Sequence, residues 1–260
     1  MEIDALIREA GRIVVVTGAG ISVASGLPTF RGDEPDAIWS RDVTEIATRH
    51  WFTRHPVEWW QWFLRAFEKV PTAEPNAAHR ALAELERWQI ERGRKFLVVT
   101  QNIDTLHEQA GSRELVKVHG TWDRVRCTRE GCGYAAPEGS LPLDRDALDR
   151  FLDDPRVENL PRCPDCSAVL RAHALLFDEY YDEHVDYDYV RVCEGLLLAD
   201  LVLFVGTSFS VGVTELAVRT AQGRGIPTVS IDPVGTPPRG VTAIRDPAEV
   251  VLPEIVARLG

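Results

Sequence analysis

Short apolar runs rich in β-branched residues recur along the chain, and each predicts a strand that is buried on both faces. Five such runs occupy positions 13–17, 96–100, 115–118, 201–205 and 228–231. Between several of them, apolar residues recur with helical spacing, notably over 77–88 and 214–222. Apolar strands that alternate with helices predict an α/β fold with a doubly wound, Rossmann-like parallel sheet.

Two stretches interrupt this alternation. Positions 34–75 are rich in aromatic residues at helical spacing, so we expect a helical insert whose aromatic residues form a small core rather than an aromatic binding box. Positions 121–169 hold two cysteine pairs around a middle rich in Asp and Pro, and they predict an inserted metal-bound module. The two inserts together would form a small domain. The segments left for the Rossmann-like domain are 1–33, 76–120 and 170–260.

Glycines follow the first predicted strand directly, in the order Gly18-Ala19-Gly20. At a strand-to-helix turn, glycines let the backbone approach a pyrophosphate, and free N–H groups at the helix start bind its charge. The spacing departs from the usual dinucleotide motif, because position 23 is Val23 and the next glycine is Gly26. A plain tight turn therefore stays open as the alternative to a phosphate site.

Polar residues stand at the carboxyl ends of the next two predicted strands, where ligands bind in sheets of this class. Gln101, Asn102 and Asp104 follow the second strand, and their side chains suit ribose hydroxyls or a carboxamide. Helix capping by Asn102 is the simpler alternative. His119 ends the third strand. A lone histidine is more often structural, but its place opposite the amide and acid cluster favours a role in proton transfer.

The last two predicted strands carry a second set of candidate ligand residues. Gly206, Thr207 and Ser208 follow the most apolar strand, and Asp232 follows the strand after it. Both positions would face the adenosine half of a dinucleotide in a doubly wound sheet. A carboxylate there accepts hydrogen bonds from a ribose diol and repels a 2′-phosphate, so Asp232 predicts NAD rather than NADP.

The composition narrows the class of protein. The 260 residues suffice for a sizeable core, and 45% hydrophobic with 27% charged residues is ordinary for a globular chain. The net charge of −11 speaks against nucleic-acid binding; it would favour Lys- and Arg-rich peptides, or serve solubility alone. The apolar runs are too short to span a membrane, and the N-terminus does not resemble a signal peptide, so we expect a cytoplasmic protein. The oligomeric state stays open, and a monomer is compatible with the sequence.

Four of the five cysteines form two close pairs, Cys127-x4-Cys132 and Cys163-x2-Cys166. In a chain without an export signal, such pairs indicate a metal before disulfides. Four thiolates in two knuckles predict a tetrahedral zinc site. Because the protein would supply all four ligands, no position is left for a substrate, and the zinc is expected to be structural.

Taken together, these residues resemble the sirtuin family of NAD-dependent protein deacylases. The shared motifs run in the family's order through nearly the whole chain: GAGISVASGLPTFRG at 18–32, TQNIDTLHEQAG at 100–111, VHG at 118–120, the two cysteine pairs, and GTS at 206–208. The resemblance implies NAD as co-substrate, a structural Zn²⁺ and an acyl-lysine protein or peptide as substrate. The implied reaction releases nicotinamide and O-acyl-ADP-ribose.

The resemblance also implies roles for individual residues. We expect catalysis from His119, Asn102 and Gln101, with His119 as the general base that deprotonates a ribose hydroxyl. Ile103 and Asp104 would line the nicotinamide pocket, and Asp104 would hold the carboxamide. The loop over the pyrophosphate and ribose would consist of Gly18, Ala19, Gly20, Phe30 and Arg31. The adenosine half would be held by Gly206, Thr207, Ser208 and Asp232.

Departures from the family pattern concern the substrate. The expected substrate residues are Leu175, Phe177 and Asp178, in the strand that pairs with the peptide in the family, and Asp178 replaces the family's usual glycine. The desuccinylating branch holds an acidic acyl chain with a Tyr-x-x-Arg pair, and Phe63 and Ala66 stand at those positions here. A buried carboxylate without a cation is costly, so an acetyl or a longer apolar acyl group is the expected substrate. Arg65 misses the arginine position by one residue.

Two alternatives to deacylation remain open. An NAD glycohydrolase or ADP-ribosyltransferase on the same fold would need the NAD pocket but no lysine channel, and the altered segment around Asp178 leaves it open. A non-catalytic NAD-sensing protein is the alternative from another class. The proton-transfer candidate His119 argues against it.

Overall fold

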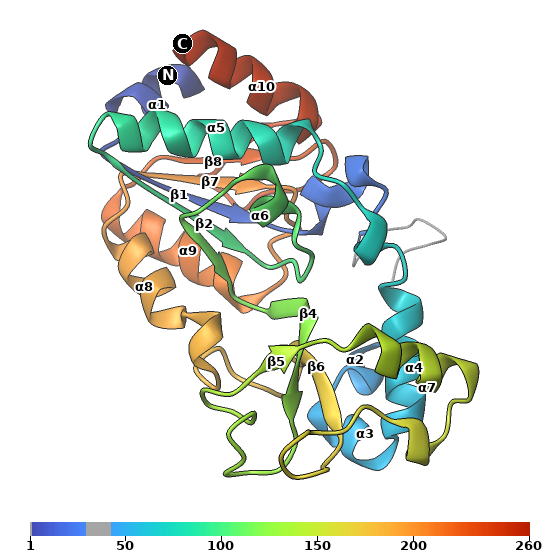
Figure 1. Ribbon diagram of the computed structural model, residues 1–260. Helices are drawn as coiled ribbons and strands as arrows, with labels where there is room; N and C mark the ends of the chain where they lie inside the picture. The colour runs from blue at the N-terminus through green and yellow to red at the C-terminus, as the bar shows by residue number, and fades with distance from the viewer. Residues whose placement is uncertain (1, 30–42) are drawn as a thin grey trace.

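The computed structural model describes residues 2–29 and 43–260 (Figure 1). In this part of the chain, the larger sheet has six parallel strands in the order β3-β2-β1-β7-β8-β9. The strands are β1 Arg12–Thr17, β2 Lys95–Thr100, β3 Leu115–Lys117, β7 Leu201–Val205, β8 Thr228–Ile231 and β9 Thr242–Ile244. The expected α/β class and parallel sheet are confirmed. β9 was not expected, because its partly exposed residues make no apolar run.

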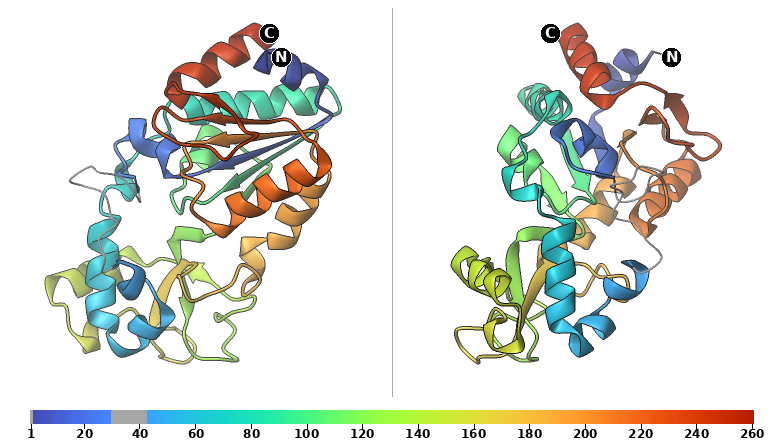
Figure 2. Two further views of the ribbon diagram at one scale, coloured as in Figure 1. Left: turned by 180° about the vertical axis from the view of Figure 1, so that it is seen from behind. Right: turned by 90° about the vertical axis from the view of Figure 1, so that its right-hand side faces the viewer.

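Helices cover both faces of this sheet, as Figures 1 and 2 show. One face packs against α1 Ile3–Glu9, α5 Ala77–Glu91 and α10 Ala248–Leu259. The other face packs against α8 Tyr189–Leu197 and α9 Gly212–Arg224. Because both faces are covered, every residue of β7 is buried, which is why its sequence reads as an unbroken apolar run.

A smaller antiparallel sheet lies beyond the carboxyl ends of the parallel strands (Figure 1). Its strands, in the order β5-β4-β6, are β5 Leu141–Pro142, β4 Gly120–Cys127 and β6 Leu170–Ala174. The helices around it are α2 Val43–Ile46, α3 Arg49–Arg54, α4 Pro56–Ala66 and α7 Arg145–Asp153. The remaining short helices are α6 Leu106–Ala110, η1 Ala19–Ser25, η2 Val70–Thr72, η3 Val157–Asn159, which contacts α7, and η4 Val185–Tyr187.

The aromatic residues of α4 form the centre of a core beneath the small sheet. Trp59 and Trp60 are fully buried, and Trp59 stacks on Phe63 with ring centroids 5.1 Å apart. Trp60 Nε1 donates to the carbonyl of Leu170 on β6 (2.9 Å), which fastens the helix to the sheet. This arrangement is the one expected of a core rather than of an aromatic binding box.

The division of the chain at 34–75 and 121–169 stays a prediction in its exact boundaries. β6, which follows the second insert, pairs with β4 in the small sheet.

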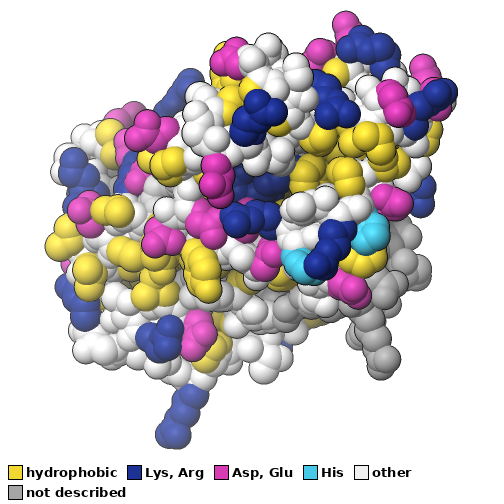
Figure 3. Space-filling model, turned by 90° about the horizontal axis from the view of Figure 1, so that it is seen from below, with side chains coloured by type: hydrophobic (Ala, Val, Ile, Leu, Met, Phe, Trp, Pro, Cys, Tyr) yellow, Lys and Arg dark blue, Asp and Glu magenta, His cyan; other side chains and the backbone are white. Residues whose placement is uncertain are grey.

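In the described part of the chain, no helix is long and apolar enough to cross a membrane. Figure 3 shows acidic and basic side chains interspersed on the face seen from below.

Candidate active site and metal centre

A cavity of about 1500 Å³ lies at the carboxyl ends of the parallel strands and reaches the small sheet. Its lining includes the candidate residues Gly18, Ala19, Gly20, Gln101, Asn102, Ile103, Asp104, His119, Leu175, Phe177, Gly206, Thr207, Ser208 and Asp232. Asp178 is not part of this lining. Phe30 and Arg31 lie outside the described residues. The structure thus gathers the candidates from six separate segments of the chain around one space.

Gly18 and Gly20 bring the loop after β1 against the loop after β7. The N–H of Gly18 donates to the carbonyl of Val205 (3.1 Å), and the N–H of Gly20 donates to the carbonyl of Gly206 (2.9 Å). A Cβ on Gly20 would lie 2.7 Å from the Cα of Gly206. Only glycine permits this approach. These two N–H groups are therefore bonded within the protein, and close packing of the two loops is the role that the structure gives these glycines.

Asn102 and Asp104 converge on the hydroxyl of Ser22. Ser22 Oγ donates to Asp104 Oδ2 (3.0 Å), and Asn102 Nδ2 approaches both Ser22 Oγ (3.1 Å) and the carbonyl of Gly18 (3.2 Å). Asn102 thus ties the loop after β2 to the glycine loop, whereas Thr105 stands at the N-cap of α6. Burial raises the pKa of Asp104 above its ordinary value, because desolvation disfavours the charged carboxylate.

His119 lines the cavity and anchors one of its two ring nitrogens on the backbone. Nδ1 lies 2.8 Å from the carbonyl of Gln101, which can only accept, so Nδ1 carries the proton and Nε2 is left with a lone pair. Burial lowers the pKa of His119 to about 4 because desolvation disfavours the imidazolium. The ring is therefore neutral near pH 7, and Nε2 is able to accept a proton.

Tyr181 contacts this same nitrogen. Its hydroxyl lies 3.4 Å from His119 Nε2, and the two rings stack with centroids 5.8 Å apart. Tyr181 in turn stacks on Tyr189 of α8 with centroids 5.0 Å apart. Neither Tyr181 nor Ser22 was among the candidates from the sequence. Two features of the sequence could have pointed to them. Tyr181 follows shortly after the expected substrate residues, and Ser22 places a hydroxyl within the glycine motif.

Asp178 fixes the segment after β6 to helix α3. Its two carboxylate oxygens accept from the backbone N–H groups of Arg49 (2.7 Å) and His50 (3.0 Å) at the start of α3. The N–H of Phe177 donates to the carbonyl of Ala47 (3.0 Å). Phe177 remains exposed and lines the cavity. The carboxylate of Asp178 therefore acts as a helix cap supplied from another segment.

A buried ion-pair cluster holds the other side of this segment. Glu179 is paired with Arg126 of β4 (2.8 Å) and Arg171 of β6 (2.5 Å), and all three side chains are almost fully buried. The N–H of Leu175 donates to the carbonyl of His119 (2.9 Å). The segment that carries Leu175 and Phe177 is thus fastened both to the small sheet and to the candidate base.

Asp232 lies where the sequence expects it, at the carboxyl end of β8, and lines the cavity. Its Oδ1 accepts from the N–H groups of Val234 (2.9 Å) and Gly235 (2.6 Å). These bonds shape the loop after β8 and hold the carboxylate in a fixed orientation.

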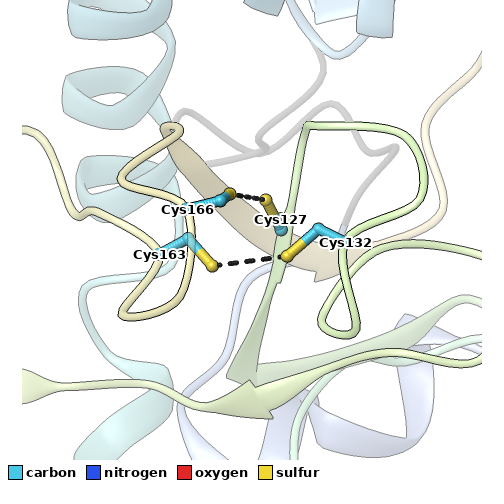
Figure 4. A group of neighbouring side chains, drawn as sticks. All are labelled: Cys127, Cys132, Cys163 and Cys166. Atoms are coloured by element: carbon cyan, nitrogen blue, oxygen red, sulfur yellow. Dashed lines mark hydrogen bonds between the residues drawn. The ribbon is translucent and has the colours of Figure 1, made fainter.

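The four paired cysteines come together at one end of the small sheet and point toward one another (Figure 4). Cys127 Sγ and Cys166 Sγ are 3.4 Å apart, Cys132 Sγ and Cys163 Sγ are 3.6 Å apart, and all four sulfurs lie within 4.8 Å. Tetrahedral Zn–S bonds of about 2.3 Å place sulfurs about 3.8 Å apart. The spacing therefore fits one zinc ion with four protein ligands and no open position.

Comparison with known proteins adds the decisive observation. A sequence model of the Sir2 family matches residues 18–213. The chain belongs to the Sir2 family. This sirtuin is 35% identical over 264 residues to the mitochondrial NAD-dependent protein deacylase sirtuin-5 of Canis lupus familiaris, with 97% of this chain and 83% of the relative covered. It is 37% identical to an NAD-dependent protein deacylase of Thermus thermophilus, with 89% and 83% covered.

Solved structures of sirtuins share its fold. A Sir2 homologue in complex with NAD is 34% identical, with a TM-score of 0.81 and coverage of 100% of this chain and 94% of that one. A Sir2 complex with a p53 peptide and NAD⁺ is 27% identical, with a TM-score of 0.78 and coverage of 99% and 98%.

The sirtuin is accordingly an NAD-dependent protein deacylase with NAD as its co-substrate. The cavity described above is large enough for a dinucleotide, and the glycines after β1 let that loop pack closely against the loop after β7. The cysteine cluster is that of a structural zinc site, as the sequence predicted.

Proposed function

We propose that this sirtuin removes acyl groups from lysine side chains, with His119 as the general base. The observation that carries the assignment is the neutral imidazole of His119, which lines the cavity with Nδ1 anchored on Gln101 and Nε2 beside the hydroxyl of Tyr181. General-base help of this kind contributes about a hundred- to ten-thousandfold to rate. Bound NAD would supply nicotinamide as the leaving group and a ribose hydroxyl, deprotonated by His119, as the acceptor of the acyl group, and one water would be consumed in releasing the lysine. The products would be free lysine, nicotinamide and O-acyl-ADP-ribose.

The residues after β2 would hold the nicotinamide end of NAD. Asn102 and Asp104 are held by Ser22, and Asp104 Oδ1 also accepts from the N–H of Leu106, so both side chains have a fixed position in the cavity lining. Asp104, with its raised pKa, would hold the carboxamide, and Ile103 would line the nicotinamide pocket. Gln101 would contact the adjoining ribose. Fixed polar groups of this kind place the substrate without further ordering cost when it binds.

The opposite half of the cavity would take the remainder of NAD. The pyrophosphate would lie over the loop of Gly18, Ala19 and Gly20, with Phe30 and Arg31 completing that loop. The adenosine half would lie against Gly206, Thr207, Ser208 and Asp232. The carboxylate of Asp232 would reject the 2′-phosphate of NADP by charge repulsion.

The peptide would lie along the segment after β6. Relatives in this family have been crystallised with p53 peptides, and the segment here presents Leu175 and the exposed Phe177 to the cavity. Asp178 would act on the peptide indirectly, by holding this segment against α3. The net charge of −11 favours substrates rich in Lys and Arg. Nucleic acid would not be a direct partner.

The acyl group would be acetyl or a longer apolar chain. Phe63 is buried, and Phe63 and Ala66 both line the cavity at the positions where desuccinylating sirtuins carry Tyr and Arg. Arg65 also lines the cavity but is exposed, so water screens its charge. A succinyl carboxylate would lose its hydration without gaining a buried cation. Desuccinylation as fast as deacetylation would refute this preference.

The test is mass spectrometry of an acetyl-lysine peptide incubated with the protein, with and without NAD, beside His119→Ala. We expect NAD-dependent loss of the acetyl group that disappears in the variant, while NAD binding measured by calorimetry is retained. Nicotinamide release that does not depend on the peptide would instead indicate a glycohydrolase. NAD binding without nicotinamide release, with any acyl peptide, would indicate a sensor.

The thiolate zinc site suits a reducing compartment, so we propose a cytoplasmic location, to be checked by fractionation.

A further inference from the structure

A second group of metal-ligating side chains lies apart from the four cysteines. It consists of His173 on β6, and His184 and Asp186 at the start of η4, with one ligand atom from each within 4.8 Å of the others. The two histidines are almost fully buried, with 1% and 2% of their surfaces exposed. Asp186 is exposed, so the group has access to solvent on one side.

His173 has an unusual environment for a buried imidazole. Neither of its ring nitrogens finds a hydrogen-bond partner among the described residues. Asp186 Oδ2 lies only 3.1 Å from Nε2, yet the two atoms are not aligned as donor and acceptor. Buried polar groups nearly always have a partner, and an exception points to a bound water or ion.

The spacing of the three ligand atoms fits an ion between them. Around a metal bound by imidazole nitrogen and carboxylate oxygen at about 2.1 Å, neighbouring ligand atoms lie about 3.0–3.4 Å apart. Here Asp186 Oδ2 lies 3.1 Å from His173 Nε2, inside this range, and 3.7 Å from His184 Nδ1, a gap that a bound ion would have to shorten by about 0.3 Å. Atoms that surround a common point face that point rather than one another, which accounts for a contact without hydrogen-bond alignment.

His184 is oriented as metal-bound histidines usually are. Its Nε2 lies 3.1 Å from the carbonyl of Gly139, which can only accept, so Nε2 carries the proton and Nδ1 has the lone pair. Donation of the second ring nitrogen to a backbone carbonyl is the common outer support of a histidine ligand. Nδ1 now accepts from the N–H of Asp186 (3.1 Å), a bond that a metal ion would replace.

We propose that His173, His184 and Asp186 form a second metal site, which binds a divalent first-row transition ion such as Zn²⁺. Two imidazoles and a carboxylate suit zinc, and water would complete the coordination on the exposed side. Histidine binds a metal through the lone pair of a ring nitrogen, and both ring nitrogens of His173 lack a hydrogen-bond partner among the described residues.

The charges around the site are accommodated. Lys117, Arg124 and Arg171 act on His173 and would oppose a cation there. Arg171 shares the carboxylate of Glu179 with Arg126, and Lys117 is paired with Glu108, so the field of both cations is reduced. Arg124 donates to Ser140 Oγ (2.9 Å), which donates to Asp186 Oδ2 (3.1 Å), so these groups hold the carboxylate in place.

An ion at this position would clip β6 to η4. β6 leads directly into the segment whose Leu175 N–H bonds to the carbonyl of His119. The second site would therefore stabilise the strand behind the candidate substrate segment, without any part in the chemistry. It does not depend on the proposed roles of the residues in the cavity.

The test is a count of zinc ions per chain in the full-length protein. Wild type, Asp186→Ala and the control Asp182→Ala, which removes an equal charge from an exposed neighbouring position, are brought to equilibrium by dialysis against a zinc buffer. Zinc is measured by mass spectrometry of the digested protein. Because Asp186 is exposed, the variant is expected to fold, and circular dichroism melts in the absence of added zinc check this.

We expect two zinc ions per chain in wild type and in Asp182→Ala, and one in Asp186→Ala, the ion held by the cysteines. Added zinc should also raise the Tm of the wild type by more than that of Asp186→Ala. A single zinc per chain in wild type would overturn the proposal and leave a water as the partner of His173. Two ions in all three proteins would also overturn it, because the second ion would then lie elsewhere.

Discussion

The structure predicts how much stability the protein loses when the carboxylate of Asp178 is removed. Its two oxygens accept from two backbone N–H groups of α3, and these bonds help to hold the Phe177 segment against the helix. In Asp178→Ala, both N–H groups lie at exposed residues and are hydrated instead. Loss of a helix cap lowers the free energy of unfolding by about 0.5–2 kcal/mol. Because water replaces the carboxylate at both N–H groups, we expect a loss near the middle of that range, about 1 kcal/mol.

This free energy has two measurable consequences. In a chain of this size, 1 kcal/mol lowers the Tm by roughly 2–4 °C. If the same free energy is needed to order the Phe177 segment around a peptide, the KM for the peptide rises by up to about fivefold, since 1.4 kcal/mol is tenfold. kcat should change little, because His119 and its anchor on Gln101 are untouched.

The assays are thermal unfolding and steady-state deacetylation of one acetyl-lysine peptide. Asp178→Asn keeps one acceptor oxygen and is expected to fall between wild type and Asp178→Ala in both measurements. The reasoning is refuted if Asp178→Ala has the Tm and KM of wild type. It is also refuted if KM rises while the Tm stays unchanged, because Asp178 would then bind the peptide directly.

Three further predictions concern the sheet loops, the ion pairs and the pH dependence. In Gly20→Ala, the new Cβ would lie 2.7 Å from the Cα of Gly206, so the loops separate, and calorimetry should show weaker NAD binding, with the zinc of the four-cysteine site retained. Glu179→Gln leaves two buried arginines without a counter-charge and should lower the unfolding free energy by about 3–5 kcal/mol in denaturant titrations; a loss under about 1 kcal/mol would contradict this. Burial lowers the pKa values of His119 and His173 from 6.5 to about 4 and 3, so the unfolded chain binds more protons, and stability should fall as the pH drops from about 6.5 to 4. A Tm that stays constant across that range in thermal melts would contradict this. For the same reason, kcat/KM should begin to fall only below about pH 5, rather than near pH 6.5.

Several features of this sirtuin were readable from the sequence because they depend on local pattern. A strand covered on both faces needs apolar side chains on both sides, so β1 and β7 stand out as unbroken apolar runs. The carboxyl ends of parallel strands meet at one edge, which made residues such as Asn102 and His119 candidates for one site. Paired cysteines predicted a zinc site, because four thiolates in two knuckles have few other uses.

Other features depend on contacts between residues far apart in the chain, which local pattern does not contain. Asp178 suggested a changed peptide contact, whereas the structure gives its carboxylate to the backbone of α3. Tyr181 and His119 are 62 positions apart in the sequence, and the fold of the segment after β6 brings their side chains into contact. His173 and Asp186 likewise meet only through the fold. Burial and hydrogen-bond geometry decide which polar side chains are satisfied, and therefore which are free for a ligand, and both are set by tertiary packing.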